Sequence, residues 1–137
     1  KMIPVEYIKK SDGITCYKIV RRDGKKYSTP FQETKINWST MHGITRFKAK
    51  GTKMNDKHHT VCCGEMLIYD GVIHSMRNLS DAEDFADYIR KNSWCGAGVE
   101  IWECFIPKGE KYMKGLDSNG YPCLGSKSIR FIKKVEE

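Results

Sequence analysis

Short stretches of alternating apolar and polar residues run along this chain, separated by pairs of turn-forming residues. Four pairs of aspartate or asparagine with glycine mark the candidate turns: Asp12-Gly13, Asp23-Gly24, Asp70-Gly71 and Asn119-Gly120. Both residue types tolerate the positive φ of the tight turns that join antiparallel strands. Segments 14–20 and 26–29 flank the second pair, and segments 66–69 and 72–76 flank the third. The pattern therefore predicts two β-hairpins.

Three more segments have strand-like patterns. Residues 45–50 alternate charged with apolar side chains, and residues 99–106 form an apolar block. Residues 129–135 begin with an Ile-Arg-Phe-Ile alternation. Each is of ordinary strand length.

A single segment has the period of an amphipathic helix. Its apolar stripe at i, i+3, i+4 and i+7 consists of Ala82, Phe85, Ala86 and Ile89. Ser80 and Glu83, at the start of this segment, fit a capping box, in which each side chain satisfies a backbone donor of the first turn. We therefore expect a helix over residues 80–91 that packs its stripe on a sheet.

These elements predict an α+β fold, with a mostly antiparallel β-sheet and one amphipathic helix packed on it. At 137 residues the chain is long enough to bury a core without disulfides or metals. It has no internal repeat and no linker-like stretch, which indicates a single globular domain over residues 1–137.

The stretch between segments 99–106 and 129–135 is rich in lysine, glycine and tyrosine. It begins with the break at Pro107-Lys108-Gly109 and returns at Ser126. We expect a long loop here, of the kind that commonly presents a binding surface.

The net charge of +7 is unevenly distributed. Residues 1–60 carry 14 basic and 5 acidic side chains, giving +9. Residues 61–105 carry 3 and 8, giving −5, and residues 106–137 carry 7 and 4, giving +3. The basic ends can build one face toward a polyanion, or they can simply complement the acidic middle within the fold.

Two basic groups are the candidate ligand-binding residues. The first, at the predicted hairpin tip, consists of Arg21, Arg22, Lys25 and Lys26. The second, in the predicted loop, consists of Lys108, Lys111, Tyr112, Lys114 and Tyr121. Lysine and arginine supply positive charge for phosphates, and a tyrosine ring can stack on a nucleobase. The alternative for each group is an ordinary solvated turn.

The six cysteines are spaced unlike a disulfide framework, and the N-terminal residues lack the apolar core of a signal peptide. We therefore expect reduced thiols and a cytoplasmic protein. No apolar run is long enough to span a membrane. Adjacent histidines and cysteines within residues 58–63 lack the paired half-sites of a zinc signature. Phosphate-binding and nucleophile-elbow motifs are also absent, so we assign no metal, cofactor or catalytic residue.

The C-terminal block at residues 103–112, which contains Ile-Pro-Lys-Gly, is similar to a pattern in small uncharacterised bacteriophage and prophage proteins. The similarity extends to Gly120-Tyr121 and residues 126–129, and to residues 71–76 leading into the predicted helix. The resemblance implies an intracellular accessory protein of a mobile element and assigns no activity.

The leading functional hypothesis is a small non-enzymatic protein that binds an anionic partner. That partner is a nucleotide-type ligand, a nucleic acid or an acidic surface of a host protein. One alternative is a nucleotide- or NAD-using transferase resembling ADP-ribosyltransferases. Its residues to examine are Arg21 or Arg22, segment 27–29, and Glu100 or Glu103. Another alternative is a structural or protein-interaction module, whose basic surface only aids solubility.

Overall fold

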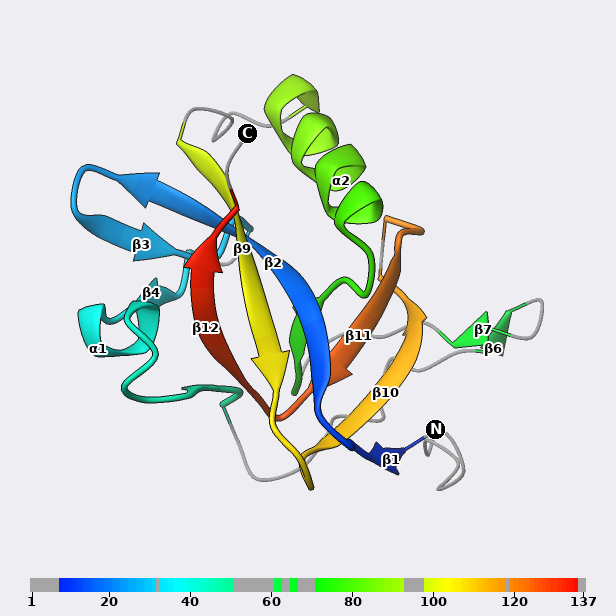
Figure 1. Ribbon diagram of the computed structural model, residues 1–137. Coiled ribbons are helices and arrows are strands. Elements are labelled where there is room, and N and C mark those ends of the chain that lie inside the picture. Colours follow the sequence, from blue (N-terminus) through cyan, green and yellow to red (C-terminus); the bar gives the residue numbers. More distant parts are fainter. Residues whose placement is uncertain are drawn as a thin grey trace.

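The computed structural model describes residues 8–31, 33–50, 61–62, 65–66, 71–92, 98–117 and 119–135. Within these ranges two sheets and one long helix dominate (Figure 1). In spatial order, the larger sheet contains β4 (Lys35–Ile36), β3 (Lys26–Ser28), β2 (Ile14–Asp23), β9 (Val99–Ile106), β12 (Ser128–Lys134) and β5 (Phe47–Lys48). The smaller contains β1 (Lys9–Lys10), β10 (Lys111–Leu116), β11 (Pro122–Ser126) and β8 (Ile73–Ser75). The remaining elements are the pair β6 (Val61–Cys62) and β7 (Glu65–Met66) and the helices α1 (Trp38–Met41) and α2 (Leu79–Asn92).

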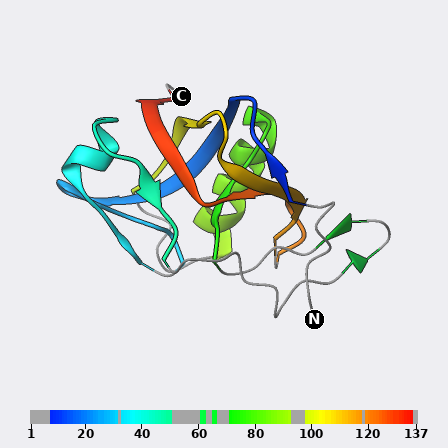
Figure 2. The same cartoon turned by 90° about the horizontal axis from the view of Figure 1, so that it is seen from below.

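Every pairing between the described strands is antiparallel, which confirms the predicted α+β class. The two sheets are continuous through the chain, because only Lys127 separates β11 from β12. They also meet where Tyr17 of β2 and Met76 exchange backbone hydrogen bonds of 2.7 and 2.8 Å. Figures 1 and 2 show β10 and β11 beside β2, and α2 alongside the β2–β9 pair.

Two hydrophobic cores lie on opposite faces of β2. Alternate residues of a strand point to opposite faces, so Ile19 packs into one core and Val20 into the other. The first core lies beneath α2 and includes Ile19, Met76, Ala82, Ala86, Ile89, Val99, Ile101, Met113 and Cys123. The second lies on the other face and includes Cys16, Val20, Ile36, Met41, Ile73, Cys104, Ile106, Leu124, Ile129 and Phe131.

The first predicted hairpin is confirmed, since β2 and β3 pair from Arg21↔Ser28 to Asp23↔Lys26 around Gly24, which has φ +63°. Of the second, segment 66–69 lies largely outside the described residues. In the described part, β8 pairs with β11 and Met66 pairs with Val61 of β6. The strands expected near 45–50, 99–106 and 129–135 are present as β5, β9 and β12.

The prediction of a long basic loop between β9 and β12 is wrong. Residues 111–116 and 122–126 form the β10–β11 hairpin instead, with Tyr112 opposite Ser126 and Leu116 opposite Pro122. Both faces of β11 are buried, so its sequence lacks the alternation of apolar and polar residues that marks a half-exposed strand. Pairing with β1 and β8 on either side supplies the hydrogen bonds that local sequence does not indicate.

The helix begins at Leu79, so Ser80 lies in its first turn and the predicted capping box is displaced. Asn78 precedes the helix, and its side-chain amide donates to the Asp81 carboxylate at 3.4 Å. Ala82, Ala86 and Ile89 are fully buried as expected. Phe85 is only partly buried, at the edge of the first core.

Lys18 is an unexpected member of the interior. It lies between Cys16 and Val20 on the second-core face of β2 and is only 8% exposed. Its amine donates to the His74 carbonyl oxygen at 2.9 Å. Burial lowers the pKa of Lys18, an effect that nearby Cys104 and Cys16 partly oppose.

Three cysteines whose side chains are described, Cys16, Cys104 and Cys123, are buried and free. Burial raises the pKa of Cys16 to about 11 and also raises those of Cys104 and Cys123. The remaining cysteine side chains lie outside the described part of the chain.

Candidate functional site

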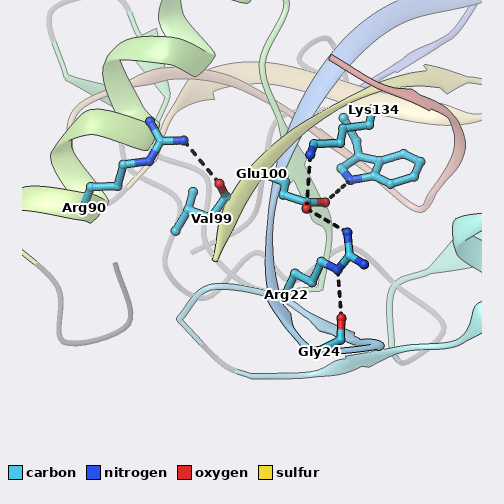
Figure 3. Close-up of polar contacts among 7 residues, drawn as sticks. Arg22, Gly24, Arg90, Val99, Glu100 and Lys134 are labelled. Carbon is cyan, nitrogen blue, oxygen red and sulfur yellow. Dashed lines mark hydrogen bonds and ion pairs between the residues drawn. The ribbon is translucent and has the colours of Figure 1, made fainter. Parts of the chain in front are cut away.

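Glu100 is the centre of a polar network on the larger sheet (Figure 3). It lies on β9 and is nearly buried, with 10% of its side chain exposed. Trp102, two residues further, points to the same face, and its indole N–H donates to Glu100 Oε1 at 3.1 Å. A buried carboxylate needs such partners, because losing its hydration costs several kcal/mol.

Two cations contact the other carboxylate oxygen. Arg22 Nη1 lies 3.3 Å and Lys134 Nζ 3.4 Å from Glu100 Oε2. They come from β2 and β12, the two strands that flank β9, and Lys134 is paired directly with Trp102. Their side chains are 45% and 47% exposed, so both keep N–H donors in contact with solvent. One carboxylate thus holds two cations and leaves a surplus of one positive charge.

Arg22 is held in place from several directions. Its Nε donates to the Gly24 carbonyl oxygen at 2.8 Å, and its guanidinium lies 5.5 Å from the centroid of the Tyr27 ring. Tyr27 in turn meets Trp102 edge to face at a ring separation of 6.0 Å. We call Arg22, Tyr27, Glu100, Trp102 and Lys134 the Glu100 network.

The backbone beneath the network is closely packed. Gly98 has φ +80°, and a Cβ there would lie 2.1 Å from the Arg22 carbonyl oxygen. Only glycine therefore lets the start of β9 approach Arg22, whose N–H donates to the Gly98 carbonyl oxygen at 2.7 Å. Arg90 of α2 ties the helix to the same place by donating to the Val99 carbonyl oxygen at 3.2 Å (Figure 3).

Three of the four residues in the first predicted basic group lie at or beside this network. Arg22 belongs to it, and Lys25 and Lys26 are exposed at the tip of the β2–β3 hairpin. Arg21 points to the other face of β2 and forms an ion pair with Glu33.

The second predicted group lies at the opposite end of the strands. Ile14 pairs with Ile106 and Arg21 pairs with Val99, so the turn with Lys108 and the hairpin tip are separated by most of the β2–β9 ladder. Seven residues of strand span about 23 Å. The two basic ends therefore do not converge on one site.

The second group is also divided internally. Lys111 and Lys114 are both exposed but lie on opposite faces of β10, and Lys111 is directly opposite Lys10 of the edge strand β1. Tyr112 is partly buried against the second core, whereas Tyr121 packs against Phe85 at a ring separation of 4.8 Å. Lys9 and Lys10 make up the edge strand β1, where lysines discourage edge-to-edge association, and Lys111 lies beside them.

Among the residues named for the transferase alternative, the fold brings Arg22, Tyr27 and Glu100 together. Ser28 lies opposite Arg21 on β3, and Glu103 points to the other face of β9. Sequence reasoning missed Trp102 and Lys134 entirely. The available signal for Trp102 was its i, i+2 spacing from Glu100, but nothing local connects Lys134 with either residue.

No cluster of histidine, cysteine and carboxylate side chains suited to a metal ion occurs among the described residues. None of the described helices is long and apolar enough to cross a membrane. Comparisons of the chain with protein-family models, with curated proteins and with solved structures gave no match.

Proposed function

We propose that this protein is a non-enzymatic binder of an anionic, phosphorylated ligand, and that the ligand binds at the Glu100 network. The observation that carries the proposal is the single carboxylate shared by two half-exposed cations. Glu100 positions Arg22 and Lys134 without neutralising both, so an incoming anion gains two charge-assisted contacts from groups already held in place.

A nucleotide-type ligand suits the surroundings of these cations. The arginine fork matches the geometry of a phosphate oxygen pair, and lysine supplies a point charge beside it. Lys25 and Lys26 at the hairpin tip add positive charge that speeds the arrival of an anion. We place the protein in the cytoplasm, a proposal supported by the three buried free cysteines.

Titration with ATP, inorganic pyrophosphate and a short single-stranded oligonucleotide, at low and high salt, tests the proposal. Replacing Arg22 or Lys134 with Gln should weaken binding about tenfold to a hundredfold, the value of one charge-assisted hydrogen bond. Lys114→Gln is the matched control, because it removes the same charge from β10 at the smaller sheet. Circular dichroism confirms that each variant is folded.

Tight binding of the oligonucleotide with weak binding of ATP would redirect the proposal to nucleic acid. Absence of binding by all three probes would leave the protein-interaction alternative. Equal losses in the Lys114 and Lys134 variants would show that net charge, rather than the Glu100 network, attracts the anion.

The transferase alternative is supported by one observation, the gathering of Arg22, Tyr27 and Glu100 from three strands. A fixed carboxylate can stabilise the positive charge that develops on a sugar when its glycosidic bond breaks. Release of nicotinamide from NAD, measured alongside NAD binding, separates the two functions. Release that is lost in Glu100→Gln while binding persists would establish an enzyme. Binding with no release would leave the non-enzymatic function.

A further inference from the structure

A cluster of aromatic rings lies on one flank of α2. Two of the rings belong to the helix, and the other two come from distant parts of the sequence. Phe85 lies 4.8 Å from Tyr121, 5.9 Å from Phe31 and 6.4 Å from Tyr88, measured between ring centroids. Tyr88 and Tyr121 are 5.8 Å apart. We call these four rings the aromatic face.

The aromatic face is open to solvent although the core beside it is closed. Phe31 is 51% and Tyr88 is 37% exposed, whereas Ala82, Ala86 and Ile89 of the same helix region are fully buried. The core therefore does not require the outer rings. Exposed aromatic side chains grouped in this way are typical of surfaces that bind a partner.

Uncompensated negative charge lies beside these rings. Asp84 is exposed one helical turn before Tyr88 and forms no ion pair with any described residue. Desolvation raises the pKa of Tyr121, and the negative charges of Asp84 and Asp117 add to this effect. On the other flank of the helix, Asp87 is paired with Arg90 at 3.4 Å.

We propose that the aromatic face binds a basic segment of a partner protein, with an arginine or lysine side chain against Tyr88 and its charge beside Asp84. A guanidinium stacks on aromatic rings and pairs with carboxylates, so the two features together select a cation. This polarity is opposite to that of the Glu100 network, and the proposal does not depend on that network.

Other occupants fit these observations less well. A nucleobase can stack on the rings, but its phosphates would meet the Asp84 carboxylate. A second copy of the chain that docks through the same face would bring two Asp84 carboxylates together, which opposes self-association there.

Fluorescence anisotropy with a short labelled peptide of alternating arginine and leucine tests the proposal. Tyr88→Ala and Asp84→Asn should each weaken binding about threefold to thirtyfold, as expected for one desolvated cation–π or ion-pair contact. Glu83→Gln is the matched control, because it removes the same charge from the opposite flank of α2 and should leave binding unchanged. Thermal melting confirms that the Tyr88 variant is folded.

A second peptide with glutamate in place of arginine should not bind. Equal binding of both peptides, no binding of either, or a loss in Glu83→Gln as large as that in Asp84→Asn would overturn the proposal. So would sedimentation that shows self-association of the wild type abolished by Tyr88→Ala, because the occupant would then be a second copy.

Discussion

Replacing the buried Lys18 with Met should stabilise this protein, and the gain should be largest at acid pH. Lys18 is 8% exposed, donates to the His74 carbonyl oxygen, and forms no ion pair with a described residue. Methionine has a similar length and fills the same space without a charge to desolvate. The lost hydrogen bond costs about 1 kcal/mol. Removing the desolvation cost of the buried charged amine stabilises the folded state by more than this, so we expect a net gain of about 1–3 kcal/mol near pH 6.

The sign of the pH dependence follows from the lowered pKa of Lys18. In the unfolded chain the pKa of a lysine is about 10.4, so between the folded and unfolded values the unfolded chain binds the extra proton. The wild type therefore gains stability as pH rises through that window, by about 1.4 kcal/mol per pH unit. Above the unfolded pKa the destabilising contribution is absent, and below the folded pKa it is complete. Lys18→Met lacks it at every pH.

Urea unfolding of both proteins, at several values from about pH 6 to about pH 10, measures the difference directly. The buried thiols lower stability at the alkaline end because burial raises their pKa. They are present in both proteins, so only the part of their pKa that the Lys18 charge sets differs between the two. The advantage of Lys18→Met should be largest below the folded pKa of Lys18 and should shrink as pH rises toward the unfolded value of about 10.4. Lys26→Met, at the exposed hairpin tip, should show no such trend. An advantage that stays constant with pH would mean that the Lys18 amine remains charged or hydrated, and would refute the reasoning.

Three further predictions concern packing. Gly98→Ala should lower the free energy of unfolding by about 2–5 kcal/mol in chemical denaturation, because its Cβ would clash with the Arg22 backbone and its φ is positive. Gly24→Ala also has a positive φ but open space around it, so it should lower the free energy of unfolding by only about 1–2 kcal/mol. Phe85→Ala should cost about 1–3 kcal/mol because the ring is only partly buried, and Ile89→Ala should cost about 2–5 kcal/mol because that side chain is fully buried. A larger loss for Phe85→Ala than for Ile89→Ala would contradict this placement of the ring. Iodoacetamide followed by mass spectrometry should leave Cys16 unmodified near pH 8 until denaturant is added, because burial raises its pKa to about 11, and rapid native labelling would contradict this.

Local patterns in the sequence were sufficient for much of the fold. Asp23-Gly24 permits only a tight turn between two β-prone segments, and β2 and β3 pair there. The spacing of Ala82, Ala86 and Ile89 places three apolar residues on one side of a helix, and α2 buries all three. The apolar run at residues 99–106 forms β9, and its two faces contribute side chains to the two cores.

Tertiary structure decided the β10–β11 hairpin, the site and the exposed rings. Residues 111–116 and 122–126 become strands because β1 and β8 pair on either side, which no local periodicity indicates. Lys134 reaches Glu100 only because β12 pairs with β9. The separation of the two basic groups is likewise set by the β2–β9 register, since charge along a chain carries no information on where the strands place it. Lys18 shows the same limit, because a lysine is expected at the surface but its position on the second-core face of β2 buries it.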